Sequence, residues 1–111
     1  MNFLWIRLVT IAIILTPFAT YAKDRIFVTN EKSNNISVID AETLNVEHTI
    51  DVGDRPRGIG LSPDSSELYV AISEENKIVV LDPNSLKILR DFEAGSDPET
   101  FGVHPNGNIY I

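Results

Sequence analysis

Apolar and polar residues alternate in short runs along most of the chain, and turn-forming residues separate these runs. Residues 25–30 alternate and are rich in β-branched and aromatic side chains, which favours a β-strand. The polar, Asn-rich stretch that follows predicts a tight turn, because Asn tolerates positive φ. On the same grounds we predict further strands at residues 36–40, 46–52, 58–62, 67–72, 77–82, 87–94 and 100–104.

The connections between these strands are short. Asn106-Gly107 is the strongest hairpin signal in the sequence, and residues 53–56 are predicted to form a loop. No helical period is visible after Ala22. Because such connections leave room only for hairpins, the sheets are expected to be antiparallel.

Residues 26–63 are repeated 42 positions later without a gap, which makes the repeat the main organising feature of the chain. A period of about 40–45 residues with several strands per unit is typical of β-propeller blades. The prediction is an all-β fold of blades, each a four-stranded antiparallel sheet. The identical pairs are Val28/Val70, Asn34/Asn76, Ile36/Ile78, Val38/Val80, Asp40/Asp82, Leu44/Leu86, Gly53/Gly95, Pro56/Pro98, Gly60/Gly102 and Pro63/Pro105.

The repeats cover about residues 25–66 and 67–108, and a third begins at 109. The first blade starts at its second strand. Closed propellers have about 4–8 blades, each covered by its neighbours on both faces. We therefore expect about two blades, a fragment of a larger propeller, which expressed alone would aggregate or fold poorly. Gly58, Gly60 and Gly102 fall in innermost strands, where we expect close packing of backbones rather than ligand contact.

Residues 1–22 have the pattern of a cleavable signal peptide. Arg7 precedes an apolar run, and Thr20-Tyr21-Ala22 fits a signal peptidase site, so Lys23 is expected to begin the mature chain. The alternative is an uncleaved anchor, but the apolar run is short of the roughly 20 residues that span a bilayer. The sequence thus predicts a periplasmic or secreted protein with no membrane contact after cleavage.

Composition narrows the choice of partners. The chain has no cysteine, which excludes a lipoprotein anchor, disulfides, thiolate metal sites and covalent haem attachment. After residue 22 it carries eight basic against sixteen acidic residues, a formal charge of −8. Nucleic acid and anionic lipid are poor partners for such a chain.

The repeat resembles the YVTN family of secreted bacterial β-propellers. The naming motif is present as Phe27-Val28-Thr29-Asn30 and more weakly as Tyr69-Val70-Ala71-Ile72. Strands ending in Val-Ile-Asp or Val-Leu-Asp also match, as does Gly-x-x-Pro followed by Ser-Pro-Asp or a variant. His104 departs from the usual Ser.

Three stretches look like one subgroup, the propellers associated with PQQ-dependent catabolism: residues 28–32, 55–60 and 95–99. This resemblance implies a periplasmic, seven-bladed protein of undefined role. It points to a periplasmic quinoprotein dehydrogenase or a cytochrome as partner, and it does not imply that the chain itself holds PQQ. No cofactor is predicted.

The loops between blades carry the candidate binding residues. Such loops open on the channel mouth of a propeller, and here they place Arg55 and Arg57 in one copy and Asp97 and Glu99 in the other. A mouth lined by these four could hold a small polar ligand or a partner's charged patch, since arginine suits carboxylate or phosphate. The alternative is solvated loop charges or inter-blade ion pairs, such as Arg57 with Glu99. The turns at 31–32 and 74–75 should open on the same face as exposed charges.

Catalytic and metal-binding patterns are weak. His48 should be exposed on an outer strand, and His104 should have a structural role beside Pro105. No Asp/Glu/His cluster has ligand spacing, and no serine has a nucleophile context. The sequence therefore favours a non-enzymatic binding or scaffold module. The rival reading is a cofactor-binding or hydrolytic propeller enzyme, haem-d1-like or lactonase-like, whose site would lie in further blades, and a weaker third is an adhesive surface module.

Overall fold

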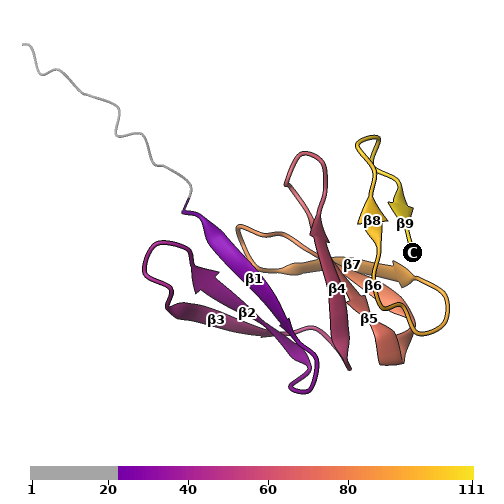
Figure 1. Cartoon of the computed structure of the whole chain (residues 1–111), viewed down its shortest axis with the longest axis horizontal. Coiled ribbons are helices and arrows are strands. Elements are labelled where there is room, and N and C mark those ends of the chain that lie inside the picture. The colour runs from indigo at the N-terminus through magenta and orange to yellow at the C-terminus, as the bar shows by residue number, and fades with distance from the viewer. Residues whose placement is uncertain (1–22) are drawn as a thin grey trace, which may run out of the picture.

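The computed structural model describes residues 23–111, and the predicted signal peptide lies outside these residues. The described part is all-β apart from one 3₁₀ turn, Ser73–Glu75. Its strands (Figure 1) are β1 (Arg25–Asn30), β2 (Asn35–Asp40), β3 (Val46–Asp51), β4 (Pro56–Leu61), β5 (Leu68–Ile72), β6 (Lys77–Leu81), β7 (Ile88–Glu93), β8 (Gly102–Val103) and β9 (Ile109–Tyr110).

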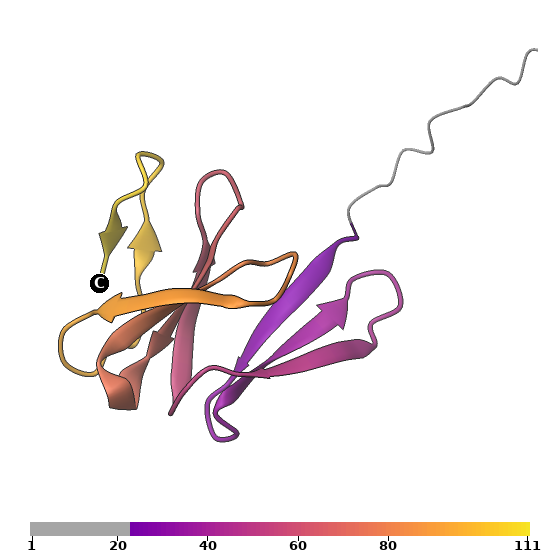
Figure 2. The same cartoon turned by 180° about the vertical axis from the view of Figure 1, so that it is seen from behind.

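The strands form three antiparallel sheets, in the orders β1-β2-β3, β4-β5-β6-β7 and β8-β9. The second sheet is a complete four-stranded blade. The first contains the three strands that correspond to β5, β6 and β7. The sheets follow one another across the molecule in both views (Figures 1 and 2).

The repeat is present in the backbone as well as in the sequence. Within the described residues, every positive φ recurs 42 positions later: Asn34/Asn76, Leu44/Leu86, Gly53/Gly95, Arg55/Asp97 and Ser65/Gly107. The bulge between Val38 and Ile39 likewise recurs between Val80 and Leu81. Asp40 and Asp82 each use Oδ1 to accept two backbone N–H groups of the following turn. The two copies are therefore the same supersecondary unit.

The core consists of two apolar layers, one on each side of the second sheet. In the first layer, Phe27 and Ile36 of the first sheet pack near Leu68, Val70 and Leu81 of the second. In the second layer, the opposite face of β5 and β6 meets the β8–β9 unit through Tyr69, Ala71, Ile78, Val80, Phe101, Val103 and Ile109. Every residue of β5 is buried, because this strand is covered on both sides.

The predicted packing role of the β4 glycines is confirmed. A Cβ on Gly58 would lie 3.0 Å from the Glu99 carbonyl oxygen, and one on Gly60 would lie 3.2 Å from the Phe101 ring. At Gly102 no described atom lies within 4 Å of such a Cβ. Because the β4 glycines lack side chains, the segment that leads into β8 can pack directly against the β4 backbone.

Two local predictions need correction. Pro56 begins β4 rather than ending a loop, and the strand predicted at residues 100–104 is limited to Gly102–Val103. The hairpin predicted around Asn106-Gly107 is confirmed, because β8 and β9 pair across it, and of these two residues only Gly107 has a positive φ. The β8–β9 turn is also one residue shorter than the β4–β5 turn. The pair Val103–Ile109 is equivalent to the pair Leu61–Leu68. Ile109 therefore lies 41 positions after its equivalent Leu68, not 42.

Candidate channel-mouth site

The β3–β4 loop is held in place by the backbone of Arg55. This residue has φ +61°, and its N–H donates to Oδ1 of Asn34 at 3.0 Å. Its carbonyl accepts hydrogen bonds from the N–H and the hydroxyl of buried Ser73, at 3.1 and 3.2 Å. The loop is therefore hydrogen-bonded to the β1–β2 turn and to the 3₁₀ turn after β5. These bonds fix the position of the Arg55 backbone from which its side chain extends.

The Arg55 guanidinium joins two carboxylates from different blades. Its Nε lies 2.8 Å from Oε1 of Glu31, and its Nη1 lies 3.2 Å from Oε1 of Glu74. The hydrogen bond from Arg55 lowers the pKa of Glu31, and in turn Glu31 first and Glu74 next raise the pKa of Arg55. The β1–β2 and β5–β6 turns thus open on the same face, as predicted, and their acids are ion-pair partners rather than isolated charges.

Arg57, at the start of β4, pairs with Glu99 in the segment between β7 and β8. Its Nη1 contacts Oε1 of Glu99, and its carbonyl accepts a hydrogen bond from Thr29 Oγ1 at 2.9 Å. This is the inter-blade ion pair that the sequence analysis offered as an alternative to a ligand site. The Glu99 side chain is 57% exposed, so the pair remains open to solvent.

Asp97 occupies the position equivalent to Arg55. It has φ +49°, and its N–H donates to Oδ1 of Asn76 at 2.9 Å, which repeats the Arg55–Asn34 contact. In the described chain its carboxylate has no hydrogen-bond or ion-pair partner. The four predicted residues therefore lie on the two loops between sheets, with Arg57 and Glu99 paired and Arg55 held by two other acids.

The sequence analysis placed the acids of the β1–β2 and β5–β6 turns on this face as exposed charges, but it did not predict their ion-pair partners. Glu74 binds Arg55, and Glu75 accepts the Asp54 N–H at 2.8 Å and pairs with Lys77 at 2.5 Å. These two contacts, Lys77 first, lower the pKa of Glu75. The useful signal was that residues 73–76, which include Glu74 and Glu75, are the 42-residue equivalents of the turn at residues 31–34, next to the loop that carries the arginines.

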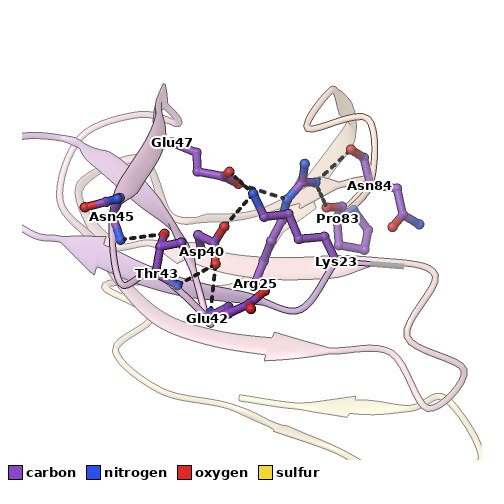
Figure 3. A network of polar contacts seen from close by, with 9 residues as sticks. All are labelled: Lys23, Arg25, Asp40, Glu42, Thr43, Asn45, Glu47, Pro83 and Asn84. Carbon is purple, nitrogen blue, oxygen red and sulfur yellow. Dashed lines mark hydrogen bonds and ion pairs between the residues drawn. The ribbon is translucent and has the colours of Figure 1, made fainter. Parts of the chain in front are cut away.

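A second polar network lies at the opposite ends of the strands and was not predicted (Figure 3). Arg25 Nη1 donates to the carbonyls of Pro83 and Asn84, at 3.1 and 3.0 Å, and so links β1 to the β6–β7 turn. Lys23 binds Asp40 at 2.5 Å and also contacts Glu47. This network connects the two blades on the side away from the rim.

Neither histidine gathers metal ligands. His48 is exposed on β3, and His104 accepts the Asn106 N–H at Nδ1 and meets Tyr110 edge-to-face. Among residues 23–111 no group of three or more His, Cys, Asp or Glu side chains is placed to hold a metal ion. The same residues include no helix with the length and apolar character needed to cross a bilayer.

Comparison with solved structures defines the class of fold as β-propeller blades. The chain superposes on the β-propeller proteins hydrazine synthase of Kuenenia stuttgartiensis (TM-score 0.70, 24% identity, 75% of this chain and 24% of that one) and dihydro-haem d1 dehydrogenase NirN (0.67, 17%, 79% and 20%). It also superposes on AztD of Citrobacter koseri (0.60, 23%, 68% and 22%). At these identities the similarity is one of fold.

Among curated proteins, the chain is similar to the uncharacterized protein YncE of Salmonella typhimurium and of Salmonella typhi. Each is 33% identical over 63 residues, which is 57% of this chain. The aligned region spans 17% of the length of each relative. No family model matches the chain.

Proposed function

We propose that this chain is an exported β-propeller of the YVTN type that acts as a non-enzymatic binding module. Its partner would be a protein with a charged patch or a small polar ligand, and it would dock on the rim made by Glu31, Arg55, Arg57, Glu74 and Glu99. The observation that carries the proposal is the convergence of these charged side chains from both inter-blade loops and both intervening turns on one face.

The energetics of the rim suit binding. The side chains of the three acids are 47–60% exposed. An exposed ion pair contributes only about 0–1 kcal/mol to stability, so opening it costs little. A partner's carboxylate or phosphate could replace Glu31 or Glu74 on the planar guanidinium of Arg55. Lysine side chains of a partner could likewise form ion pairs with the carboxylates of Glu31 or Glu74 once these leave Arg55.

The resemblance to propellers associated with PQQ-dependent catabolism supplies the proposed partner. We expect a periplasmic quinoprotein dehydrogenase or a cytochrome, in a host that oxidises alcohols. The acidic chain, at −8 after residue 22, would favour encounter with a basic patch.

The test compares the wild type with an Arg55→Glu/Arg57→Glu variant as baits in periplasmic extract from cells grown on an alcohol. The wild type should retain a quinoprotein or cytochrome, identified by mass spectrometry, and the variant should lose it. Arg90→Glu is the control, because Arg90 lies on the outer strand β7, away from the rim, and pairs there with Glu67. Recovery of neither protein class, or equal recovery by all baits, would refute the proposal.

A second candidate is a cofactor-binding propeller, because one fold neighbour is named as a dihydro-haem d1 dehydrogenase. The similarity to that protein is at 17% identity and concerns the fold. Titration of haem into the purified chain separates the candidates. A saturable shift of the haem absorption band would favour the cofactor reading, and free-haem spectra throughout would favour the binding module.

A further inference from the structure

The β8–β9 turn carries the one asparagine of the sequence that is followed by glycine, Asn106-Gly107. Because glycine has no side chain, nothing on Gly107 hinders the approach of its backbone nitrogen to the side-chain amide carbon of Asn106. Both residues are exposed. The pair is therefore a candidate for covalent change as well as for chain reversal.

The repeat shows that a turn in this position stays in contact with water. The equivalent turn between β4 and β5, at residues 63–66, is exposed. It is exposed although both faces of the second sheet are covered. Covering the faces of a blade thus leaves such a turn accessible. At Gly107 itself, no described atom lies within 4 Å of the place where a Cβ would stand.

The Asn106 side chain is held in the direction that a reaction with Gly107 requires. Its Oδ1 accepts the Asn108 N–H at 3.0 Å, so the side chain folds forward along the chain, past the Gly107 nitrogen. This N–H also polarises the amide carbonyl and stabilises negative charge that develops on Oδ1. By contrast, Oδ1 of Asn34 and Oδ1 of Asn76 accept N–H groups from loops 21 residues away.

The other copy of the turn shows that a carboxylate fits in place of this amide. Asp64 is the equivalent of Asn106, 42 positions earlier. Its Oδ1 accepts the Ser66 N–H at 3.0 Å, which repeats the contact between Asn106 and Asn108. Hydrogen bonds from Ser66 first lower the pKa of Asp64 to about 2, so its carboxylate is ionised at neutral pH. The turn at Asn106 is thus the amide form of a turn whose acid form is present in the same chain.

We propose that Asn106-Gly107 is a modification site, at which spontaneous deamidation converts the amide into a carboxylate in the folded protein. The Gly107 nitrogen bonds to Cγ of Asn106 and gives its proton to water. The Cγ–Nδ2 bond breaks, and ammonia leaves with a proton taken from water, so a cyclic imide remains. Water then opens this ring. Addition at Cγ gives an aspartate in a normal chain, and addition at the backbone carbonyl carbon gives an isoaspartate. Nothing is oxidised or reduced, and water is the only co-reactant.

The contacts of the turn determine the course of this reaction. The Gly107 N–H donates to the His104 carbonyl at 2.8 Å, and this hydrogen bond opens before the nitrogen attacks. Because the N–H has to lose its proton, the rate rises with hydroxide concentration. The Asn108 N–H lies beside the oxygen on Cγ, which favours addition of water at Cγ. Aspartate is therefore favoured over isoaspartate.

The new carboxylate changes the charge of a cleft on the side away from the rim. Asn106 lines this cleft of about 350 Å³ together with Asp64, Glu67 and Tyr69, between the β4–β5 and β8–β9 turns. The hydrogen bond from Arg90 lowers the pKa of Glu67, so both acids already present are ionised at neutral pH. Deamidation adds another negative charge beside them, and it does so without using any residue of the rim.

The first experiment follows the purified protein during incubation at neutral and at mildly alkaline pH. Mass spectrometry of the tryptic peptide that begins at Asp91 should show the mass gain of replacing NH₂ by OH, faster at the higher pH. Fragmentation should assign the gain to Asn106 and not to Asn108. Gly107→Ser is the matched variant, because the equivalent Ser65 occupies the turn with φ +60°. The serine side chain hinders the attack, so this variant should show no gain over the same incubation.

The second experiment compares the protein with its own tryptic peptide, incubated free in the same buffer. Chromatography separates the aspartate and isoaspartate products, and the protein should give the larger share of aspartate. An intact Asn106 in the protein while the free peptide deamidates would overturn the proposal, because the Gly107–His104 hydrogen bond would then protect the turn. Equal rates in the wild type and Gly107→Ser, or the same product ratio in protein and peptide, would also overturn it.

Discussion

At the scale of single residues, the repeated positive-φ positions show where backbone conformation dictates residue choice. Asn34 and Asn76 use the left-handed region to turn the chain, and their side-chain oxygens then fix the next loop. Asn is well suited to this role because it tolerates that region. Sequence alone predicted the Asn turns, but not that the same Asn would position Arg55 and Asp97.

Gly53 and Gly95 provide a matched test of strain and space. Gly53 has φ +121°, and a Cβ there would lie 2.6 Å from Glu75 Oε1 and 2.9 Å from Ile72 Cγ2. Gly95 has φ +76° and open space around it. Gly95→Ala should cost about 1–2 kcal/mol of stability for the backbone alone, and Gly53→Ala should cost more. Thermal unfolding of both variants checks the order, and equal costs would contradict the contact argument.

Asp40 should make stability depend on acid pH. Its hydrogen bond with Lys23 and then the backbone N–H of Thr43 lower its pKa to about 2. A carboxylate with a lowered folded-state pKa adds stability that is complete above its unfolded pKa of about 3.9 and is lost as pH falls through the folded value. The melting temperature of the wild type should therefore fall between about pH 4 and pH 2.

Asp40→Asn is the matched variant for this prediction. It should melt at a lower temperature near neutral pH and should show a shallower fall on acidification than the wild type. Asp64, whose pKa is also about 2 through its contacts with Ser66 and Ser62, keeps part of the slope in both proteins. Parallel curves for the two proteins would remove Asp40 as a source of the dependence.

At the scale of elements, burial distinguishes residues of the same type in neighbouring strands. Ile78 in β6 is 0% exposed, whereas Ile88 in β7 is 50% exposed. β6 has a sheet on each side, whereas β7 is the last strand of its sheet.

Truncation of these two isoleucines should reflect that difference. Ile78→Ala should destabilise the fold by about 2–5 kcal/mol, because it loses buried contacts and leaves a cavity. Ile88→Ala should cost about 1 kcal/mol or less, since half of the side chain already meets water. Chemical denaturation of both variants measures the difference, and similar midpoints would mean that β7 is covered by another surface.

At the scale of the whole molecule, the blades are joined by apolar layers and by polar contacts at both ends. The rim pairs join the blades at one end, and Arg25 reaches the β6–β7 turn at the other (Figure 3). Arg25 is more buried than Lys23, at 23% against 49% of the side chain exposed. Its bonds to Pro83 and Asn84 link β1 to the second blade, whereas the Lys23 pairs with Asp40 and Glu47 stay within the first sheet.

Substitution of Arg25 should loosen the contact between the blades. Arg25→Ala removes two charge-assisted hydrogen bonds and should cost about 1.5–3 kcal/mol, with faster amide exchange in the turn at residues 82–87. Lys23→Ala removes contacts to Asp40 and Glu47, which both lie in the first sheet, and should leave exchange in that turn unchanged. Hydrogen exchange measured by mass spectrometry compares the two variants with the wild type. Unchanged exchange in Arg25→Ala would show that the apolar layer alone holds the two blades together.

The sequence by itself determined the repeat, the β-strands, their antiparallel order and the face on which the charged turns open. These follow from local alternation, from turn residues such as Asn34 and Gly107, and from the spacing of identical positions. Only the tertiary structure decided which acids bind Arg55, that Arg25 bridges to the β6–β7 turn, and that equivalent residues such as Val28 and Val70 differ in burial. The reason is that a repeated sequence encodes equivalent surfaces, while the pairing of charges and the covering of a face depend on which copy lies next to it in space.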